Sequence, residues 1–218
     1  MISKTFPGPS WTSSHVYGEG AMNLQKKFCY FHIPKCASMW MRKYLSNMGE
    51  YHVDGDWVEC NFTRDNINDF VKIIILRDPV KRWISALPFK DNAVDTFNKE
   101  PRAFDLIFEN LEEWLYDEHH ARQTSFIAGL DLSNTVFFWC DENLAVNMED
   151  FFIKQGYRNT QPPPPVNEHD DSQLTADVIK TWQQLLCIPK YLDSFYKTFA
   201  KDYELINSVK FYKARNVN

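Results

Sequence analysis

The chain has 218 residues, of which 44% are hydrophobic and 16% aromatic, and its formal net charge is -5 at pH 7. This size and composition fit one α/β domain with a packed core and exclude a chain that is mostly disordered. The acidic balance and the absence of a Lys/Arg run in the sequence argue against a nucleic-acid partner. The five cysteines form no C-x-x-C pair, so we expect free thiols in a reducing compartment and no metal site.

The N-terminal stretch, residues 1–24, contains Pro, Gly and Ser/Thr without apolar periodicity. It predicts an irregular arm, which leaves residues 25–218 as the folded domain. The first residues lack the apolar segment of a signal peptide, and no apolar stretch has the length of a membrane span. We therefore expect no membrane span and a cytoplasmic location.

The next stretch predicts a strand, a tight loop and a helix. Residues 28–33 form an apolar, aromatic run that is too short for a helix, and a proline ends it. Beyond the loop, Trp40, Tyr44 and Met48 recur every four residues, as on one apolar helical face. The N–H groups of the first helical turn and the positive end of the helix dipole favour a phosphate in the loop, where Lys35 adds a full charge.

A second strand and helix follow. Residues 72–77 are a β-branched run suited to a central parallel strand. Arg77 ends this run, at the edge where open α/β sheets bind ligands. Pro79 is tolerated in the first turn of the helix that comes next. On this helix Arg82 comes four residues after Asp78, a spacing that predicts a surface ion pair.

The remaining elements are predicted from apolar periodicity and from prolines. A short strand is expected around residues 57–60, and a third apolar strand at 135–140 leads into a helix. The prolines of residues 161–167 predict a stiff polyproline spacer on the surface. Core-facing helices are expected at 104–115, 174–186 and 191–205.

Two of these stretches resemble motifs of one enzyme family. Pro34-Lys-Cys-Ala-Ser-Met-Trp40 resembles the P-K-S-G-T-T-W loop of sulfotransferases, which holds the 5′-phosphosulfate of 3′-phosphoadenosine 5′-phosphosulfate (PAPS). His32-Ile-Pro-Lys-Cys-Ala-Ser38 is closer still to the carbohydrate sulfotransferase form. Leu76-Arg-Asp-Pro-Val-Lys-Arg-Trp-Ile-Ser85 resembles the family's 3′-phosphate motif, an Arg with a Ser eight residues later, and Arg77 and Ser85 keep that spacing.

The resemblance spans about residues 26–206. It implies a P-loop NTPase-like sulfotransferase fold, a single domain with a central parallel sheet flanked by helices. It also implies transfer of a sulfuryl group from PAPS to a hydroxyl or amine of an unidentified acceptor, either a small molecule or a carbohydrate, leaving adenosine 3′,5′-bisphosphate. Two alternatives remain: a nucleotide kinase-like P-loop enzyme, although no Walker A sequence is present, and a non-catalytic nucleotide-binding module. The sequence does not indicate an oligomeric state.

The family motifs assign roles to individual residues. Lys35 is the expected catalytic cation, placed near the bridging oxygen from which the sulfuryl group leaves. Met39 stands where the family has Thr, so one hydroxyl contact is missing. Trp40 is expected to stack on adenine, with a core tryptophan as the alternative. The expected donor-binding residues are Lys35, Cys36, Ala37, Ser38, Met39, Trp40, Arg77 and Ser85.

The acceptor must lose a proton, so the reaction needs a general base. His52 is the expected base, because it precedes Arg77 by about the separation at which the family places its histidine. Glu59, His119 and His120 are the alternatives. The reaction implied by the resemblance needs no metal ion.

Overall fold

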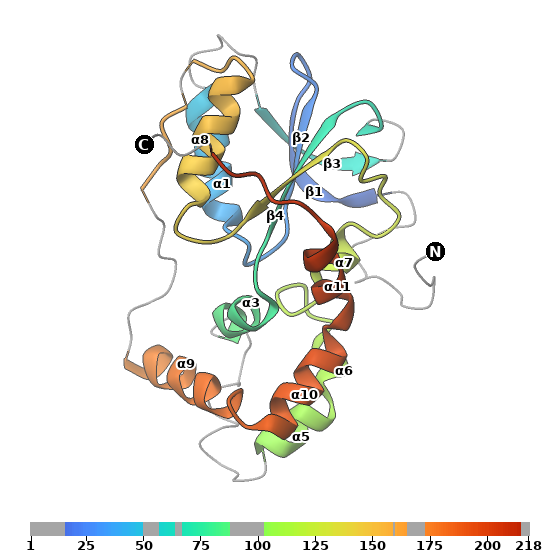
Figure 1. Ribbon diagram of the computed structural model, residues 1–218, viewed down its shortest axis with the longest axis vertical. Coiled ribbons are helices and arrows are strands. Elements are labelled where there is room, and N and C mark those ends of the chain that lie inside the picture. The colour runs from blue at the N-terminus through green and yellow to red at the C-terminus, as the bar shows by residue number, and fades with distance from the viewer. Residues whose placement is uncertain are drawn as a thin grey trace. The chain divides into compact units, whose positions relative to one another are not determined.

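The computed structural model describes residues 16–49, 57–63, 67–87, 103–158, 160–164 and 173–214 (Figure 1). The chain forms two compact units. The first comprises residues 1–77, 125–166 and 208–218, and the second comprises residues 78–124 and 167–207. The assignment of residues 25–218 to one domain stays a prediction.

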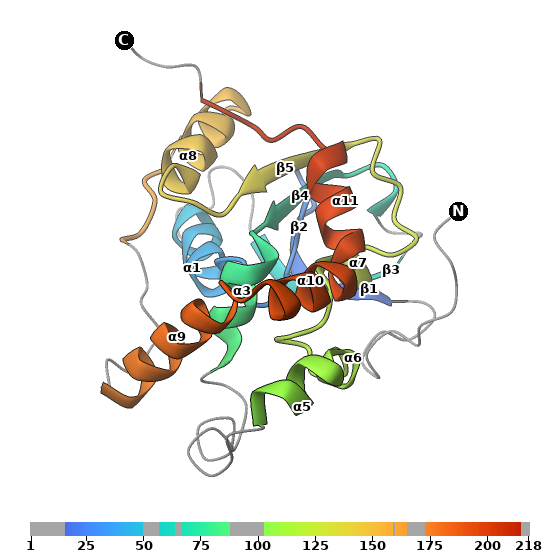
Figure 2. The same ribbon diagram turned by 60° about the horizontal axis from the view of Figure 1, so that its bottom comes forward.

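A five-stranded mixed sheet is the framework of the first unit, with strand order β3-β1-β2-β4-β5 (Figures 1 and 2). Its strands are β1 (Val16–Asn23), β2 (Phe28–Phe31), β3 (Trp57–Thr63), β4 (Val71–Leu76) and β5 (Thr135–Trp139). β2, β4 and β5 run parallel, as expected. β1 pairs antiparallel with both β2 and β3, so the sheet is mixed rather than wholly parallel.

The strand β1 lies where the sequence predicts an irregular arm, and residues 16–23 differ from that prediction. Gly18 and Gly20 interrupt the pattern by which a strand is recognised. Pairing with two neighbours nevertheless holds the segment extended: Gly20 lies opposite Phe31 of β2 on one side and Cys60 of β3 on the other. Long-range backbone pairing therefore overrides weak local propensity here. Residues 1–15 lie outside the described residues.

Two helices of the first unit pack side by side on one face of this sheet (Figures 1 and 2). They are α1 (Ser38–Gly49) and α8 (Leu144–Lys154). Tyr44 of α1 meets Phe152 of α8 edge to face, with ring centroids 5.6 Å apart. Phe28 of β2 meets Phe151 of α8 in the same way at 5.9 Å. The loop between β2 and α1 is thus held between two packed elements.

The second unit is helical. Its helices are α3 (Pro79–Ala86), α5 (Ala103–Glu109), α6 (Leu111–Trp114), α9 (Gln173–Leu185), α10 (Pro189–Thr198) and α11 (Ala200–Ser208), and α7 (Gln123–Phe126) spans the boundary between the units. Its core gathers around Trp83, whose ring lies within 6.1 Å of Trp182, 5.8 Å of Phe195 and 5.7 Å of Phe199. Aliphatic residues, among them Ile84, Leu87 and Leu111, complete this core.

Two of the predicted helices are each divided in the structure. The helix expected at 104–115 breaks at Asn110, whose side-chain amide donates to the carbonyl of Leu106 at 2.7 Å and so competes with the helical backbone bonds. The helix expected at 191–205 breaks at Phe199, where φ is -100° and ψ is 16°. Apolar periodicity continues across both breaks, which is why the sequence gives no sign of them.

A buried carboxylate fixes one turn of the second unit. Asp202 of α11 accepts hydrogen bonds from the backbone N–H groups of Gln123 and Thr124, each at 2.9 Å, and from the Thr124 hydroxyl at 2.9 Å. Burial raises the pKa of Asp202, and the two N–H donors oppose that shift. The side chain thereby satisfies N–H groups at the start of α7 that have no helical partner of their own.

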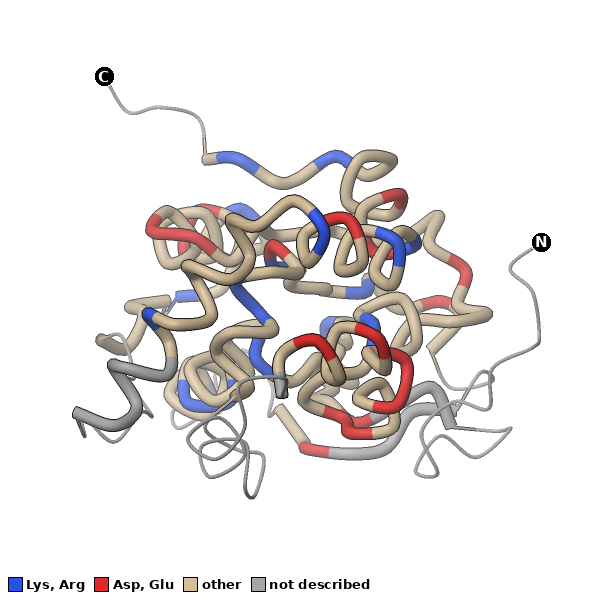
Figure 3. Tube along the Cα trace, turned by 90° about the horizontal axis from the view of Figure 1, so that it is seen from below, with Lys and Arg blue, Asp and Glu red and all other residues tan. Residues whose placement is uncertain are grey.

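Charged residues are distributed over many elements of the described chain, and Lys and Arg do not gather in one run (Figure 3). Within the same residues, no helix combines the length and the apolar character that crossing a membrane requires.

Candidate functional site

The loop after β2 begins with a tight turn. Cys36 N donates to the carbonyl of Ile33 at 3.2 Å, Pro34 takes the second position, and Lys35 takes the third with a φ of 66°. These are the features of a type II turn, whose third position requires a positive φ and therefore favours glycine. Ala37 also has a positive φ, 58°.

The positive φ angles of two non-glycine residues in one loop indicate a ligand-binding site. Each such residue carries roughly 1–2 kcal/mol of backbone strain, and strain of this kind collects at ligand-binding loops. Left-handed residues that alternate with right-handed ones also turn successive N–H groups to the same side, which forms a concave site for an anion. In this loop the φ angles of Lys35 and Ala37 are positive and that of Cys36 between them is not, so the sign of φ alternates as such a site requires.

The helix that follows the loop adds further donors. α1 begins at Ser38, and Met41 N donates to the carbonyl of Ala37 at 2.9 Å. The N–H groups before Met41 have no carbonyl four residues back within the helix, as at any helix start. Cys36 is one of the expected donor-binding residues, but its N–H already donates to the carbonyl of Ile33 within the turn. The amides suited to a 5′-phosphosulfate are therefore those from Ala37 to Met39, not from Cys36.

The second predicted motif meets this loop. Arg77 directly follows β4, and its Nη1 donates to the backbone carbonyl of Lys35 at 3.0 Å. β2 and β4 are adjacent and parallel, so their C-terminal ends lie at the same edge of the sheet. Lys35 and Arg77 are both half-buried there. The structure thus brings together the two residues on which the sequence interpretation depends.

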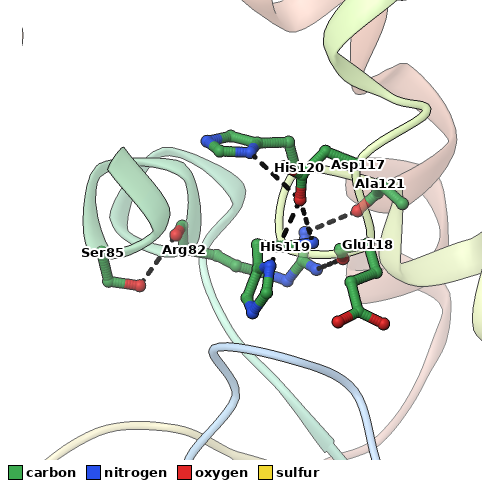
Figure 4. A network of polar contacts seen from close by, with 7 residues as sticks. All are labelled: Arg82, Ser85, Asp117, Glu118, His119, His120 and Ala121. Carbon is green, nitrogen blue, oxygen red and sulfur yellow. Dashed lines mark hydrogen bonds and ion pairs between the residues drawn. The ribbon is translucent and has the colours of Figure 1, made fainter. Parts of the chain in front are cut away.

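Ser85, the partner expected for Arg77, belongs to α3 of the second unit. It is buried, and its hydroxyl donates to the carbonyl of Arg82 at 2.8 Å (Figure 4). Arg77 belongs to the first unit and Ser85 to the second. A shared grip of Arg77 and Ser85 on one phosphate stays a prediction.

Trp40 is placed as a core side chain. It is 8% exposed, and its indole N–H donates to the carbonyl of Pro163 at 2.9 Å. Tyr44, one turn further along α1, donates its hydroxyl to the carbonyl of Thr160 at 2.6 Å. Stacking on adenine would require Trp40 to leave this packed position, so the alternative of a core tryptophan describes the structure.

The same contacts correct the prediction for the proline segment. Thr160 and Pro163 are buried and accept hydrogen bonds from α1, whereas Gln161 and Pro164 are exposed, so the segment is anchored at Pro163 and is not a spacer that lies wholly on the surface. Residues 165–167 lie outside the described residues. Proline carbonyls remain available as acceptors although the ring removes the N–H. The indole N–H of Trp40 uses the carbonyl of Pro163 in this way, which an interpretation from composition does not anticipate.

A polar cluster that the sequence did not reveal lies on the first unit around Arg42 of α1. Arg42 Nε is 3.3 Å from Glu59 Oε1, and Arg42 Nη2 is 3.3 Å from His32 Nδ1 and 3.7 Å from Glu19 Oε2. Glu59, one of the alternative bases, is mostly exposed. His52, the preferred base, lies outside the described residues.

The other alternative bases lie in the second unit. Asp117 Oδ1 is 3.3 Å from His119 Nδ1 and 3.6 Å from His120 Nδ1 (Figure 4). His120 is fully buried, and its ring lies edge-on to Trp83 with centroids 4.5 Å apart. His120 and His119 hold the pKa of Asp117 well below its usual range. These contacts describe a structural network, in which His120 is fully buried while His119 and Asp117 are partly exposed.

Arg82 also differs from its prediction. It is 2% exposed, and its guanidinium donates to the carbonyls of Ala121 at 2.5 Å and Glu118 at 3.2 Å. Asp78, the expected ion-pair partner, instead caps α3 by accepting from Lys81 N at 2.9 Å. Buried carbonyls need donors, and a guanidinium offers several in a fixed geometry, so Arg82 serves the fold of the second unit.

Comparisons with models of protein families, with curated proteins and with solved structures find no match for this chain. In the part of the chain that the structure describes, no three His, Cys, Asp or Glu side chains are grouped so as to hold a metal ion. The functional argument therefore rests on the residues and geometry of the loop itself.

Proposed function

We propose that the protein is a PAPS-dependent sulfotransferase with a P-loop NTPase-like fold, closest to the carbohydrate sulfotransferase type. The single observation that carries this proposal is the hydrogen bond from Arg77 Nη1 to the Lys35 carbonyl, 3.0 Å long. It joins two motifs that the sequence relates to the two phosphate groups of one nucleotide. A donor with a 5′-phosphosulfate and a 3′-phosphate suits such a pair of cationic groups at one sheet edge.

The donor would be held mainly by its anionic groups. The N–H groups of Ala37, Ser38 and Met39 and the positive end of the α1 dipole suit the 5′-phosphosulfate. Arg77 suits the 3′-phosphate, because a guanidinium can grip a phosphate through two parallel hydrogen bonds. In the proposal Ser85 supplies a hydroxyl to the same phosphate, as in the family motif.

The reaction would be an in-line transfer. The acceptor oxygen or nitrogen forms a bond to sulfur while the bond from sulfur to the bridging oxygen breaks, and adenosine 3′,5′-bisphosphate leaves. Negative charge grows on the bridging oxygen, where the Lys35 ammonium stabilises it. A base removes the acceptor's proton, and we assign this role to His52, with Glu59 as the alternative.

Binding can be tested without knowing the acceptor. Calorimetry should show that adenosine 3′,5′-bisphosphate binds the wild-type protein without Mg²⁺, and more tightly than ATP does. Lys43→Gln serves as the control variant, because it removes an exposed positive charge from α1 that the proposal does not use. No binding of the bisphosphate by the wild type would refute the proposal, and tight Mg²⁺-dependent binding of ATP would favour the kinase-like alternative.

Transfer is tested with PAPS labelled in its sulfuryl group and a panel of sugars, phenols, alcohols and amines. Label should move to one acceptor class, and Lys35→Ala should reduce turnover on the order of 10²-fold to 10³-fold, the usual loss when a charge-stabilising donor is removed. Comparing His52→Gln with Glu59→Gln then identifies the base. Tight bisphosphate binding without transfer to any acceptor would favour the non-catalytic module.

A further inference from the structure

One peptide group of the loop is held at both ends. Its carbonyl belongs to Lys35 and accepts from Arg77 Nη1 at 3.0 Å. Its N–H belongs to Cys36 and donates to the carbonyl of Ile33 at 3.2 Å. The second bond is local, within the turn, whereas the first comes from the end of a different strand. Arg77 is thus a distant residue in sequence that contacts the backbone of the turn.

This peptide stands between the two left-handed residues of the loop. Lys35 precedes it with a φ of 66°, and Ala37 follows with a φ of 58°. A non-glycine residue keeps a positive φ only where surrounding contacts hold it. The directions of the next N–H groups, on Ala37 and Ser38, depend on this same stretch of backbone. A contact that fixes the peptide therefore also aims those donors.

We propose that Arg77 is a positioning residue for the 5′-phosphate loop, in addition to its proposed contact with the 3′-phosphate. It acts through the Lys35 carbonyl, which it holds so that the amides of Ala37 and Ser38 face one anion. The inference rests on the proposed function, since it concerns how that nucleotide is bound. Its consequence is that Arg77 contributes to binding of a nucleotide that has no 3′-phosphate at all.

Ligands with one phosphate separate the two roles of Arg77. We would measure affinities of wild type, Arg77→Gln and Lys43→Gln for adenosine 5′-monophosphate and adenosine 3′,5′-bisphosphate by calorimetry, at fixed salt. Arg77→Gln should weaken binding of the 5′-monophosphate by about tenfold or more, as expected when a hydrogen bond from a charged group is lost. Lys43→Gln, which removes a charge but no contact to the loop, should change it less than about twofold.

A readout of the loop backbone separates positioning from simple loss of charge. Amide hydrogen exchange, followed by NMR on the full chain without ligand, should be faster in Arg77→Gln at Cys36, whose N–H donates within the turn, and unchanged in the strands of the sheet. The stoichiometry of calorimetric binding shows in the same samples whether the variant is folded. A merely global loss of stability would speed exchange throughout the first unit and would contradict the inference.

The outcomes are distinct. If Arg77→Gln binds the 5′-monophosphate like the wild type but loses affinity for the bisphosphate, the positioning role is wrong and the proposed function stands. If the 5′-monophosphate binds less tightly while exchange at Cys36 is unchanged, Arg77 acts by charge alone and the inference is again wrong. If the wild type binds neither nucleotide, the proposed function fails, and that result is seen before any variant is made.

Discussion

The indole N–H of Trp40 donates to the carbonyl oxygen of Pro163, 2.9 Å away and 123 residues along the chain. Trp40 lies in the first turn of α1, directly after the phosphate-binding loop proposed above. Pro163 lies in the segment after α8. The helix that would present its N-terminus to an anion is therefore fastened to a distant segment by side chains on its own buried face.

Removing this hydrogen bond should reduce stability measurably. Trp40→Phe keeps an aromatic ring but leaves the buried Pro163 carbonyl without the indole donor, so we expect a loss of roughly 1–3 kcal/mol in the free energy of unfolding. Urea denaturation measures it. Tyr44→Phe, which removes the hydroxyl that donates to Thr160, should lower stability by a similar amount, whereas Tyr116→Phe at a 73% exposed position should change nothing. A Trp40→Phe variant as stable as the wild type would show that this contact is dispensable.

The stability of variants at position 37 should depend on how well the new residue tolerates a positive φ. Its φ of 58° is unstrained for glycine and strongly disfavoured for a β-branched residue. Ala37→Gly should change the free energy of unfolding by less than about 1 kcal/mol, because relief of strain offsets the greater entropy of the unfolded chain. Ala37→Val should destabilise by more than about 1 kcal/mol. Equal stability of the two variants in urea would contradict a left-handed backbone at this position.

The network around Asp117 should make stability depend on pH. The pKa of Asp117 is lower in the folded protein than the value of about 3.9 expected in the unfolded chain. Its stabilising contribution is therefore complete above about pH 5 and is lost as the pH falls through the unfolded and then the folded pKa. Asp117→Asn should be less stable than wild type by roughly 1–2 kcal/mol at pH 7, and the difference should shrink towards pH 2. Urea denaturation at a series of pH values measures this difference.

The neighbouring carboxylate of Glu118 provides the control for that experiment. Its side chain is exposed, and its contact with Arg82 is made by the backbone carbonyl, which Glu118→Gln leaves in place. The variant should therefore follow the wild type at every pH. A constant gap between Asp117→Asn and wild type down to pH 2 would show that the carboxylate's ionisation is not what stabilises the network.

Met39 provides a gain-of-affinity test of the proposed donor site. It is the second residue of α1 and is 49% exposed, where the family motif has a hydroxyl-bearing Thr. Met39→Thr should bind adenosine 3′,5′-bisphosphate about 2-fold to 10-fold more tightly, the value of one added hydrogen bond. Met39→Val, which has the shape of Thr without its hydroxyl, should not. Equal calorimetric affinities of the Thr and Val variants would contradict a phosphate contact at this position.

Elements with a strong apolar pattern were predictable, and those defined by distant partners were not. The sequence indicates the strands β2, β4 and β5 and the helices α1 and α9 from short β-branched runs and helical spacing. It does not indicate β1, whose glycines hide a strand that exists through pairing on both edges. The packed position of Pro163 likewise depends on donors from α1, which no local pattern reveals.

The candidate site shows the same division. The proximity of Lys35 and Arg77 follows from a general rule, because the C-terminal ends of adjacent parallel strands share one edge of the sheet. The atoms through which they meet do not follow from it. The contact uses a backbone carbonyl, and its place depends on the positive φ of Lys35. The Arg42 cluster was missed because its members come from three strand or loop segments and one helix, brought together only by folding.

The order of strands in the sheet has a consequence for synthesis of the protein. β4 lies between β2 and β5, and Lys72 of β4 pairs with Thr135 of β5. The whole stretch 77–134 must therefore leave the ribosome before β5 can pair with β4. Until then one edge of β4, a run of isoleucines, has no strand beside it. Pairing of two strands that are so far apart in the sequence is slow and leaves apolar edges open to self-association. We therefore expect a nascent chain that is halted before residue 135 to self-associate more readily than the complete chain.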